Sequence, residues 1–400
     1  MCVRDMKHGG DSMILIHRLF SQLGLGIGLV CMVSSFSAIA GAPPTEPGVT
    51  AHTIVIGQSA GFTGPVSDSV KQLTEGAKLY FDLINKQGGV FDRKIVLESI
   101  DDGYDAKRAF ANTSKLINDS KVFALFLYRG TPTTEAAIPL LTSSRVPLIA
   151  PVTGAESLHQ PMNRYLFNVR AKYGEEVNKV VEQLYSMGLK RFAAFSPLDA
   201  FGVDGENALR TAIKKNNLPD PLIIHYERNA ADVQGYVSSL VAAKPQAIMM
   251  FCTPKPCALF ISAFRKAGGT QQLVTLSNVS TPDFISSLGD NSRGLGFTQV
   301  FPDPTDSTVP ISKELITALA SRRDLSNSYQ LMEGFISAKV LVEGLRRCGP
   351  IPTREKLITA LESMGGLDMG GLKLNYGPNS RDGSNFIELT VIGQGGHILK

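Results

Sequence analysis

Adjacent carboxylates at Asp101 and Asp102 are the residues that most resemble catalytic machinery, because paired acids can divide general acid and general base work. Gly103 follows them, and such a run is also typical of a turn, in which the carboxylates accept backbone hydrogen bonds. Of the two interpretations we favour the turn. The sequence holds no G-x-S-x-G, H-E-x-x-H or phosphate-loop motif. We therefore expect no catalytic residues and a binding function.

Cysteines offer a second kind of chemistry. Cys252 and Cys257 could close a small disulfide loop in an oxidising compartment, which would leave Cys348 single. They could equally remain two reduced, half-buried thiols. No histidine stands near the pair, so we expect neither a metal site nor a cofactor.

The N-terminus resembles an export signal. Residues 23–36 form an apolar run of 14 residues, preceded by His17 and Arg18 and followed by Ala38-Ile39-Ala40. A basic start, an apolar centre and an A-x-A site are typical of a secretory signal peptide. We expect residues 1–40 to be removed by cleavage near Ala40, residues 41–50 to form an exposed lead-in, and the remainder to be periplasmic.

The composition bounds the rest of the chain. Its 400 residues include 43% hydrophobic and 19% charged residues, which is typical of a globular protein. The net charge of +4 is small and scattered, so we expect no nucleic-acid partner. A chain of this length exceeds one hydrophobic core, which favours two lobes.

Short apolar runs alternate with helical stripes along most of the chain. Examples are the expected strands at 53–57 and 122–128 and the expected helix at 73–85, whose apolar residues recur at helical spacing. Continuous apolar strands joined through helices predict parallel sheets covered on both faces, twice over. Ligands bind such sheets beyond the carboxyl ends of the strands. The important loops therefore follow Gly57, Tyr128, Ala150, Phe195, Phe251 and Leu276.

Short motifs within and beside these loops resemble those of the type I periplasmic binding proteins, in the leucine/isoleucine/valine-binding branch that serves ABC transporters. Their order and spacing over about 250 residues carry the resemblance. The motifs are Gly57 with Thr63-Gly64-Pro65, residues 84–90, Asp101-Asp102, residues 147–151, Phe201-Gly202, Asp232 and residues 293–297.

The resemblance implies an α/β fold of two doubly wound lobes, with mostly parallel sheets and a ligand cleft between the lobes. Lobe one would comprise residues 51–169 and 301–372, and lobe two residues 170–300 and 373–400. Three crossovers would join them, and hinge closure would enclose the ligand.

The resemblance also implies ligand contacts after the third and fourth strands. Thr131, next to Gly130, falls on the hydroxyl position that meets a ligand carboxylate, at the start of a helix whose free N–H groups favour an anion. Capping of that helix is the alternative role for Thr131. At Val152, Thr153 and Gly154 the family binds an ammonium with a carbonyl and a hydroxyl, but here Gly154 stands at the hydroxyl position and Thr153 one residue early.

The acid that completes the family's ammonium site is missing. It would come from the loop at 277–280, where Asn278 is the candidate ligand contact and no carboxylate occurs before Asp283. An ammonium without a charged partner binds poorly in a dry cleft. The ligand could therefore be an aromatic or branched-chain keto acid without an α-amino group, unless Asp68 or Asp283 compensates.

Four further residues have two interpretations each. Phe201 and Tyr173 are expected either to cover the ligand or to pack the hinge, and Thr253 is a weaker ligand candidate. Arg129 could neutralise a ligand carboxylate, although an arginine at a strand end is more often solvated or ion-paired at the surface.

Together these features predict a substrate-binding component of an ABC transporter. Its expected partners are a small carboxylate or amino acid and the permease subunits in the inner membrane, and we expect a monomer. The alternative is a ligand-presenting partner of a membrane sensor with the same fold.

Overall fold

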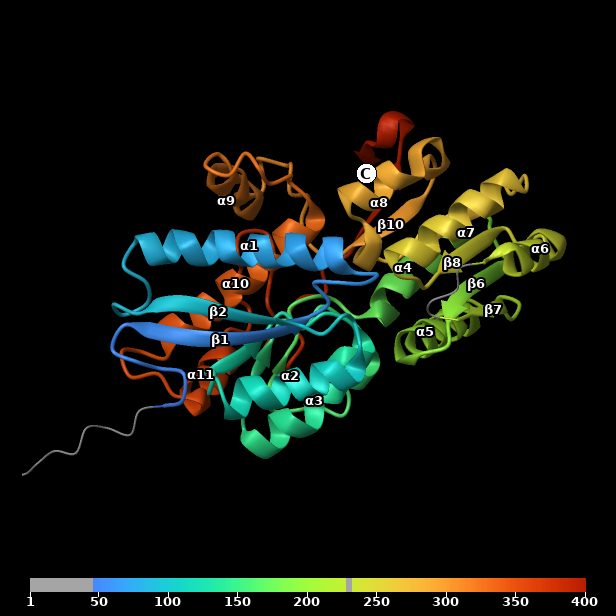
Figure 1. The fold of residues 1–400 in the computed structure, drawn as a ribbon. Coiled ribbons are helices and arrows are strands. Elements are labelled where there is room, and N and C mark those ends of the chain that lie inside the picture. Colours follow the sequence, from blue (N-terminus) through green and yellow to red (C-terminus); the bar gives the residue numbers. More distant parts are fainter. Residues whose placement is uncertain (1–45, 228–231) are drawn as a thin grey trace, which may run out of the picture. The chain divides into compact units, whose positions relative to one another are not determined.

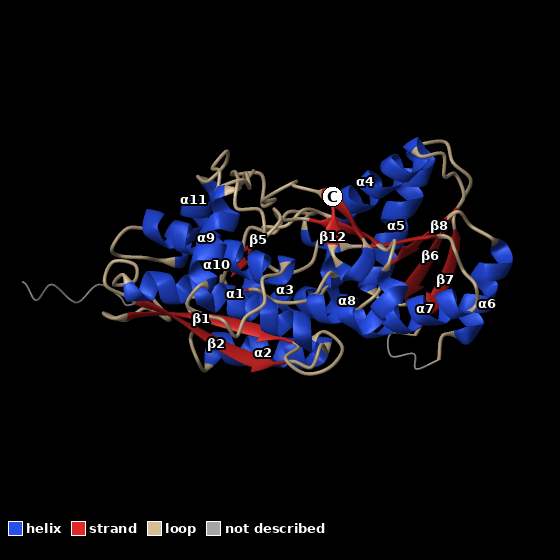
Figure 2. Cartoon of the chain, turned by 90° about the horizontal axis from the view of Figure 1, so that it is seen from above, coloured by secondary structure: helices blue, strands red, loops and turns tan. Residues whose placement is uncertain are grey.

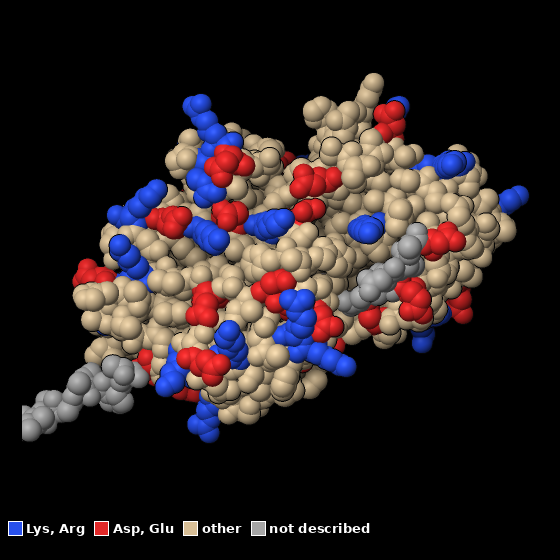
Figure 3. Space-filling model, in the orientation of Figure 1, with Lys and Arg blue, Asp and Glu red and all other residues tan. Residues whose placement is uncertain are grey.

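The computed structural model describes residues 46–227 and 232–400, which belong to one unit of the chain, 44–400. The expected signal peptide at 1–40 and the first half of the lead-in lie outside the described residues. None of the described helices is long and apolar enough to cross a membrane. Basic and acidic side chains are interspersed on the face drawn in Figure 3.

The first sheet has five strands in the order β2-β1-β3-β4-β5, and every neighbouring pair is parallel. Its strands are β1 (Thr53–Ala60), β2 (Lys94–Asp101), β3 (Ala124–Phe126), β4 (Leu148–Ile149) and β5 (Leu166–Phe167). Its helices are α1 (Ser67–Lys86), α2 (Ala106–Asn118), α3 (Thr131–Ser144), α9 (Pro310–Leu319), α10 (Tyr329–Arg347) and α11 (Arg354–Glu362).

Both faces of this sheet are buried. Phe126 of β3 lies in the core formed with α1 and α10, whereas its neighbour Leu125 lies in the core formed with α2 and α3. In Figure 1, α1 and α2 accordingly lie on opposite sides of β1 and β2. Alternate side chains of a strand point to opposite faces, so a sheet between two helix layers needs the continuous apolar runs seen in the sequence.

The second sheet has seven strands in the order β12-β11-β10-β9-β8-β6-β7. Its strands are β6 (Phe192–Pro197), β7 (Leu222–Tyr226), β8 (Ala247–Met250), β9 (Gln272–Thr275), β10 (Gly296–Gln299), β11 (Glu388–Ile392) and β12 (Ile398–Leu399). Its helices are α4 (Tyr173–Ser186), α5 (Ala200–Lys215), α6 (Gln234–Ala243), α7 (Pro254–Lys266) and α8 (Pro282–Leu288). Only the pairs that β11 makes with β10 and β12 are antiparallel among the described strands.

The expected fold class, two mostly parallel sheets covered by helices, is confirmed (Figures 1 and 2). The chain passes between the sheets three times: after β5, after β10 and before β11. We keep the names lobe one and lobe two for the first and second sheets with their helices. β5 is not among the strands expected from the sequence, because a strand of two residues carries no periodic signal.

The third passage between the lobes comes later than expected. Residues 373–384 were assigned to lobe two, but Leu374 and Tyr376 lie in the core of lobe one. The ring of Tyr376 packs edge-on against Phe167 at 5.4 Å between centroids, and the Ser384 N–H donates to the Val169 carbonyl. The packing therefore places this segment beside β5, and lobe two resumes near β11.

Candidate functional site

Loops at the carboxyl ends of strands from both sheets meet in the structure. The Arg129 guanidinium, in the loop after β3, donates from Nη2 to the Asn278 carbonyl in the loop after β9, over 3.0 Å. Both residues are buried. Parallel strands present their carboxyl ends at one edge of a sheet, so this contact lies where α/β folds bind ligands.

Two threonine hydroxyls form the centre of the lobe-one side. Thr131 Oγ1 and Thr153 Oγ1 are 2.7 Å apart and both residues are buried. Thr131 is the first residue of α3, and the N-cap position belongs to Gly130, which makes no side-chain cap. The alternative role proposed for Thr131, capping of α3, is therefore wrong, because its hydroxyl pairs with Thr153.

The neighbouring loop residues are held by backbone contacts. The Val152 carbonyl, expected to face an ammonium, accepts the Gly130 N–H over 3.3 Å, and the Gly154 carbonyl accepts the Tyr173 N–H over 2.8 Å. A Cβ on Gly154 would lie 2.7 Å from the Ala171 carbonyl oxygen. Gly154 thus permits a close approach between this loop and the start of α4.

An aromatic pair from lobe two lies beside the hydroxyls. The rings of Tyr173 and Phe201 are 5.2 Å apart between centroids, in an edge-on arrangement, and both are buried. Burial raises the pKa of the Tyr173 hydroxyl, while Arg170, Arg129 and the Thr153 side chain act in the opposite direction. The structure thus brings four of the expected residues into one cluster: Thr131, Thr153, Tyr173 and Phe201.

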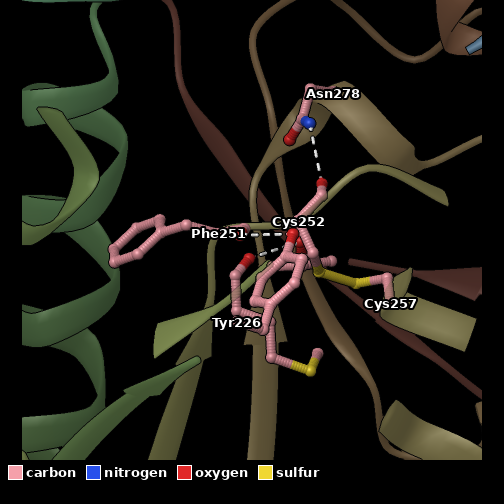
Figure 4. The surroundings of a disulfide bond; sticks show 7 residues. Tyr226, Phe251, Cys252, Cys257 and Asn278 are labelled. Carbon is pink, nitrogen blue, oxygen red and sulfur yellow. Dashed lines mark hydrogen bonds between the residues drawn. A yellow bond between two sulfur atoms is a disulfide. The ribbon is translucent and has the colours of Figure 1, made fainter. Parts of the chain in front are cut away.

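The remaining lobe-two candidates surround a disulfide, which the structure has in place of two reduced thiols. Cys252 and Cys257 are bonded, with 5.4 Å between their Cα atoms, and Thr253 lies inside the loop that they close. Asn278 Nδ2 donates to the Cys252 carbonyl over 3.1 Å (Figure 4). Thr253 Oγ1 and Asn278 Oδ1 are buried and have no hydrogen-bond partner within the described chain.

Asp68 lies apart from the buried cluster. It is exposed in the first turn of α1 and lines a cavity of about 390 Å³ with Lys255 and Asp283, which are also exposed. The two acids offered as substitutes for the missing carboxylate are therefore solvated, unlike the hydroxyls and aromatic rings.

A buried ionic network, not predicted from the sequence, lies at the first passage between the lobes. Arg170 donates to Glu176 of α4 over 3.2 Å, to Glu333 of α10 over 3.4 Å, and to the Ser277 hydroxyl. Glu176 also accepts the Ser277 N–H over 3.1 Å. One signal was available, because Glu176 stands on the apolar stripe of α4, among Tyr173, Val177 and Val180.

The pKa shifts of Arg170 and Glu333 result from burial and from the neighbouring charges, which act in opposite directions. Burial lowers the pKa of Arg170, but Glu333, Tyr173 and Glu176 more than offset it, so the net direction is upward. Burial raises the pKa of Glu333, against the opposing effects of Arg170 and Arg129.

Asp101 and Asp102 serve a turn. Asp101 accepts the N–H groups of Thr63 and Gly103 over 3.0 Å each. Burial alone would raise the pKa of Asp101. These two bonds, together with the bonds from the Thr63 hydroxyl and Arg108, outweigh burial and lower the pKa to about 2. Asp102 accepts the Tyr104 N–H over 2.8 Å, and burial raises its pKa to about 6. In the described part of the chain, no group of three or more His, Cys, Asp or Glu side chains could hold a metal ion.

Comparisons with known proteins agree with this geometry. The periplasmic binding protein family model matches residues 53–390. The Leu/Ile/Val-binding protein homolog 3 of Brucella melitensis biotype 1 is 24% identical over 303 residues, which cover 74% of this chain and 79% of that protein.

Solved structures give the same result. A substrate-binding periplasmic protein from Ralstonia solanacearum is 32% identical, with a TM-score of 0.82, covering 86% of this chain and 99% of that one. A possible leucine/isoleucine/valine-binding protein from Rhodopirellula baltica SH 1 is 28% identical, with a TM-score of 0.82, covering 88% and 97%. The chain therefore belongs to the periplasmic binding protein family, in its type I leucine/isoleucine/valine-binding branch, and has a solute-binding role.

Proposed function

We propose that this protein is the extracytoplasmic substrate-binding component of an ABC transporter and that it captures a small carboxylate-bearing solute, a branched-chain amino acid or a related acid. The observation that carries the proposal is the buried Thr131–Thr153 hydroxyl pair, at the start of α3 and beside the lobe-two ring of Tyr173. The Brucella and Rhodopirellula proteins are named as a Leu/Ile/Val-binding protein homolog and a possible leucine/isoleucine/valine-binding protein, which supports the same class of ligand.

Each part of this cluster has a role in capture. The first N–H groups of α3 and the threonine hydroxyls can donate to a carboxylate, which the helix dipole also favours. Tyr173 and Phe201 supply apolar surface from the other lobe, so the ligand is enclosed only when the lobes close. Capture changes no covalent bond of the ligand, so the site needs only hydrogen-bond donors and apolar walls.

A thermal-unfolding panel tests the ligand class. The panel holds leucine, isoleucine, valine, phenylalanine, their 2-oxo acids and benzoate. A ligand at 1,000 times its dissociation constant is expected to stabilise the protein by about 4 kcal/mol, a shift of several degrees. Thr131→Val should abolish the shift, and it should lower the stability of the unliganded protein only by about 1 kcal/mol, for the buried hydrogen bond to Thr153 that is lost. If no acid of the panel shifts the unfolding transition of the folded wild-type protein, the proposal is contradicted.

Export and transport need their own measurements. Intact mass of the protein recovered from the producing cell's periplasm should correspond to cleavage near Ala40. If a permease and an ATPase are encoded beside this gene, as the proposal expects, vesicles carrying both should accumulate the ligand only when the binding protein is present. Ligand binding without any effect on uptake would favour the alternative role beside a membrane sensor.

A further inference from the structure

A hydrogen bond joins the two lobes beside the first passage between them. Asp204 of α5, in lobe two, accepts the Glu156 N–H at Oδ1 over 2.8 Å. Glu156 begins a short helical turn, Glu156–Leu158, in the chain between β4 and β5 of lobe one. Helix α3 of lobe one also contacts α5. Asp204 is half-buried, so its carboxylate lies in the surface of lobe two that lobe one covers.

Lobe one surrounds the Asp204 carboxylate with charges. Glu156 and Glu135 of α3 repel it, and His159 acts in the opposite sense. Glu135 is held by the Ser157 hydroxyl, which donates to it over 2.6 Å. The neighbours of Asp204 one turn away on its own helix are uncharged: Ala200, Asn207 and Ala208. Asp204 thus meets two carboxylates that belong to the other lobe.

The cations near this boundary are paired with other acids. Lys172, in the first passage, forms ion pairs with Glu156 at 3.3 Å and Asp382 at 3.2 Å. His159 Nδ1 lies 2.5 Å from a carboxylate oxygen of the same Asp382. Asp204 forms no ion pair within 4 Å among the described residues. Lys172 therefore offsets part of the Glu156 charge but does not reach Asp204.

A cavity of about 600 Å³ gives Asp204 access to water. It is lined by Asp204, by Glu156 of lobe one, and by Glu175 and Lys179 of α4. Glu175 and Lys179 are exposed, so solvent screens their opposite charges. Asp204 can therefore exchange a proton with solvent while the protein stays folded.

Separation of the lobes changes the surroundings of Asp204. With the lobes together, burial raises the pKa of Asp204 to about 6, against the Glu156 N–H and His159, and the charges of Glu156 and Glu135 add to the rise. When the lobes separate, water replaces these lobe-one groups, so the carboxyl returns toward its ordinary pKa of 3.8. The joined arrangement therefore binds this proton more tightly than the separated one.

We propose that closure of the lobes takes up a proton at Asp204, so that the protein captures its solute more tightly in mildly acidic than in neutral surroundings. The inference rests on the proposed function, in which closure encloses the ligand. A protonated carboxyl keeps one oxygen for the Glu156 N–H and no longer repels Glu156 and Glu135. Linkage then makes the affinity highest below about pH 4, decreasing as the pH rises through about 6 and level above about pH 7.

Calorimetry measures the proton directly. Leucine and 4-methyl-2-oxopentanoate are titrated at pH 5 and pH 7.5, each in two buffers of different ionisation enthalpy, and both probes keep one charge state over this range. The wild type should take up about 0.8 proton per bound probe at pH 5 and almost none at pH 7.5, and it should bind about tenfold more tightly at pH 5. Asp204→Asn, which keeps the acceptor oxygen, should show neither effect.

Glu206→Gln is the matched control, because this carboxylate also belongs to α5 but contacts His225 of the same lobe, at 2.9 Å. The control should keep the proton uptake and the pH dependence of the wild type. Proton uptake that is absent in the wild type, or unchanged in Asp204→Asn, overturns the inference and leaves the transport function standing.

Small-angle scattering tests closure without a ligand. The radius of gyration of the unliganded wild type should be smaller at pH 5 than at pH 7.5, whereas that of Asp204→Asn should be equal at both. If neither probe binds at either pH, the proposed branched-chain ligand class is contradicted, and scattering alone decides the inference. A radius that does not respond to pH in the wild type, or responds equally in Asp204→Asn, then overturns it.

Discussion

The backbone conformation at Gly130 restricts which residue can stand immediately before Thr131. Its φ of 105° lies in the region that favours glycine, and a Cβ there would lie 2.3 Å from Cε2 of the Tyr104 ring. The amide that Gly130 donates to the Val152 carbonyl depends on this conformation. A single residue thus sets the position of Thr131 relative to Thr153.

Gly130→Ala should therefore destabilise the protein by about 1 to 3 kcal/mol and weaken ligand binding, because the new methyl group forces the loop or Tyr104 to move. Urea unfolding gives the first quantity and calorimetry the second. Gly174→Ala is a matched control at the start of α4, where nothing lies within 4 Å of the added Cβ. It should be neutral or stabilising by up to about 1 kcal/mol. Equal losses in both variants would contradict the role given to Gly130.

Asp204 of α5 is a titrating residue whose effect on stability can be isolated. Burial raises its pKa to about 6, helped by the carboxylates of Glu156 and Glu135 and opposed by the Glu156 N–H and His159. The folded protein therefore binds this proton more tightly than the unfolded chain. Its stabilising contribution is complete below the unfolded pKa of 3.8 and is lost as the pH rises through about 6.

Asp204→Asn should consequently raise the free energy of unfolding by about 2 to 3 kcal/mol at pH 8 and change it little at pH 4. Asparagine keeps the oxygen that accepts the Glu156 N–H over 2.8 Å. Asp101→Asn is the control of opposite sign, because the pKa of Asp101 is lowered and its ionised form stabilises the fold at neutral pH. A pH-independent effect of Asp204→Asn would refute this assignment.

Among the elements, α7 begins inside a covalent loop. The Cys252–Cys257 disulfide joins the loop after β8 to the first turn of α7, and Asn278 of the loop after β9 bonds to the Cys252 carbonyl. This arrangement holds Thr253 in place although its hydroxyl makes no cap to α7. The element therefore presents its first residues as a fixed wall of the candidate site.

Replacement of both Cys252 and Cys257 by serine should lower the unfolding free energy by about 2 kcal/mol, the loop-closure entropy of so short a loop. Differential scanning calorimetry with and without dithiothreitol measures it: reductant should lower the transition of the wild type but not of the variant. Cys348→Ser, at a buried free cysteine, should keep the response to reductant. An unchanged unfolding transition of the wild-type protein after full reduction of its disulfide would contradict this prediction.

In the whole molecule, contacts between the lobes extend beyond the ligand cluster. Gln330 of α10 donates from Nε2 to the Ser277 carbonyl over 3.3 Å and to the Ser280 hydroxyl over 3.2 Å. It is buried, and its partners belong to the loop after β9. These bonds join the two lobes, so we expect them to stabilise the closed arrangement.

Gln330→Ala should weaken binding of the ligand found in the panel by about three- to tenfold, because each lost hydrogen bond contributes about 1 kcal/mol to closure. Calorimetry measures the affinity, and small-angle scattering should show a larger radius of gyration at the same ligand concentration. Gln183→Ala, at an exposed position of α4, should leave both values unchanged. An unchanged affinity in Gln330→Ala would show that these contacts also persist in the open form.

The sequence by itself determined the alternation of strand and helix, the burial of both sheet faces and the loops at the carboxyl strand ends, because these features follow from local hydrophobic patterns. The tertiary structure alone decided which buried charges are paired. Arg170 and Glu333 are 163 residues apart in the chain, yet they bond, while Arg129 forms no ion pair within 4 Å among the described residues. Pairing depends on distances across the folded molecule, and no local pattern encodes them. The same reason applies to Tyr376, whose place beside Phe167 depends on the packing at the edge of the first sheet.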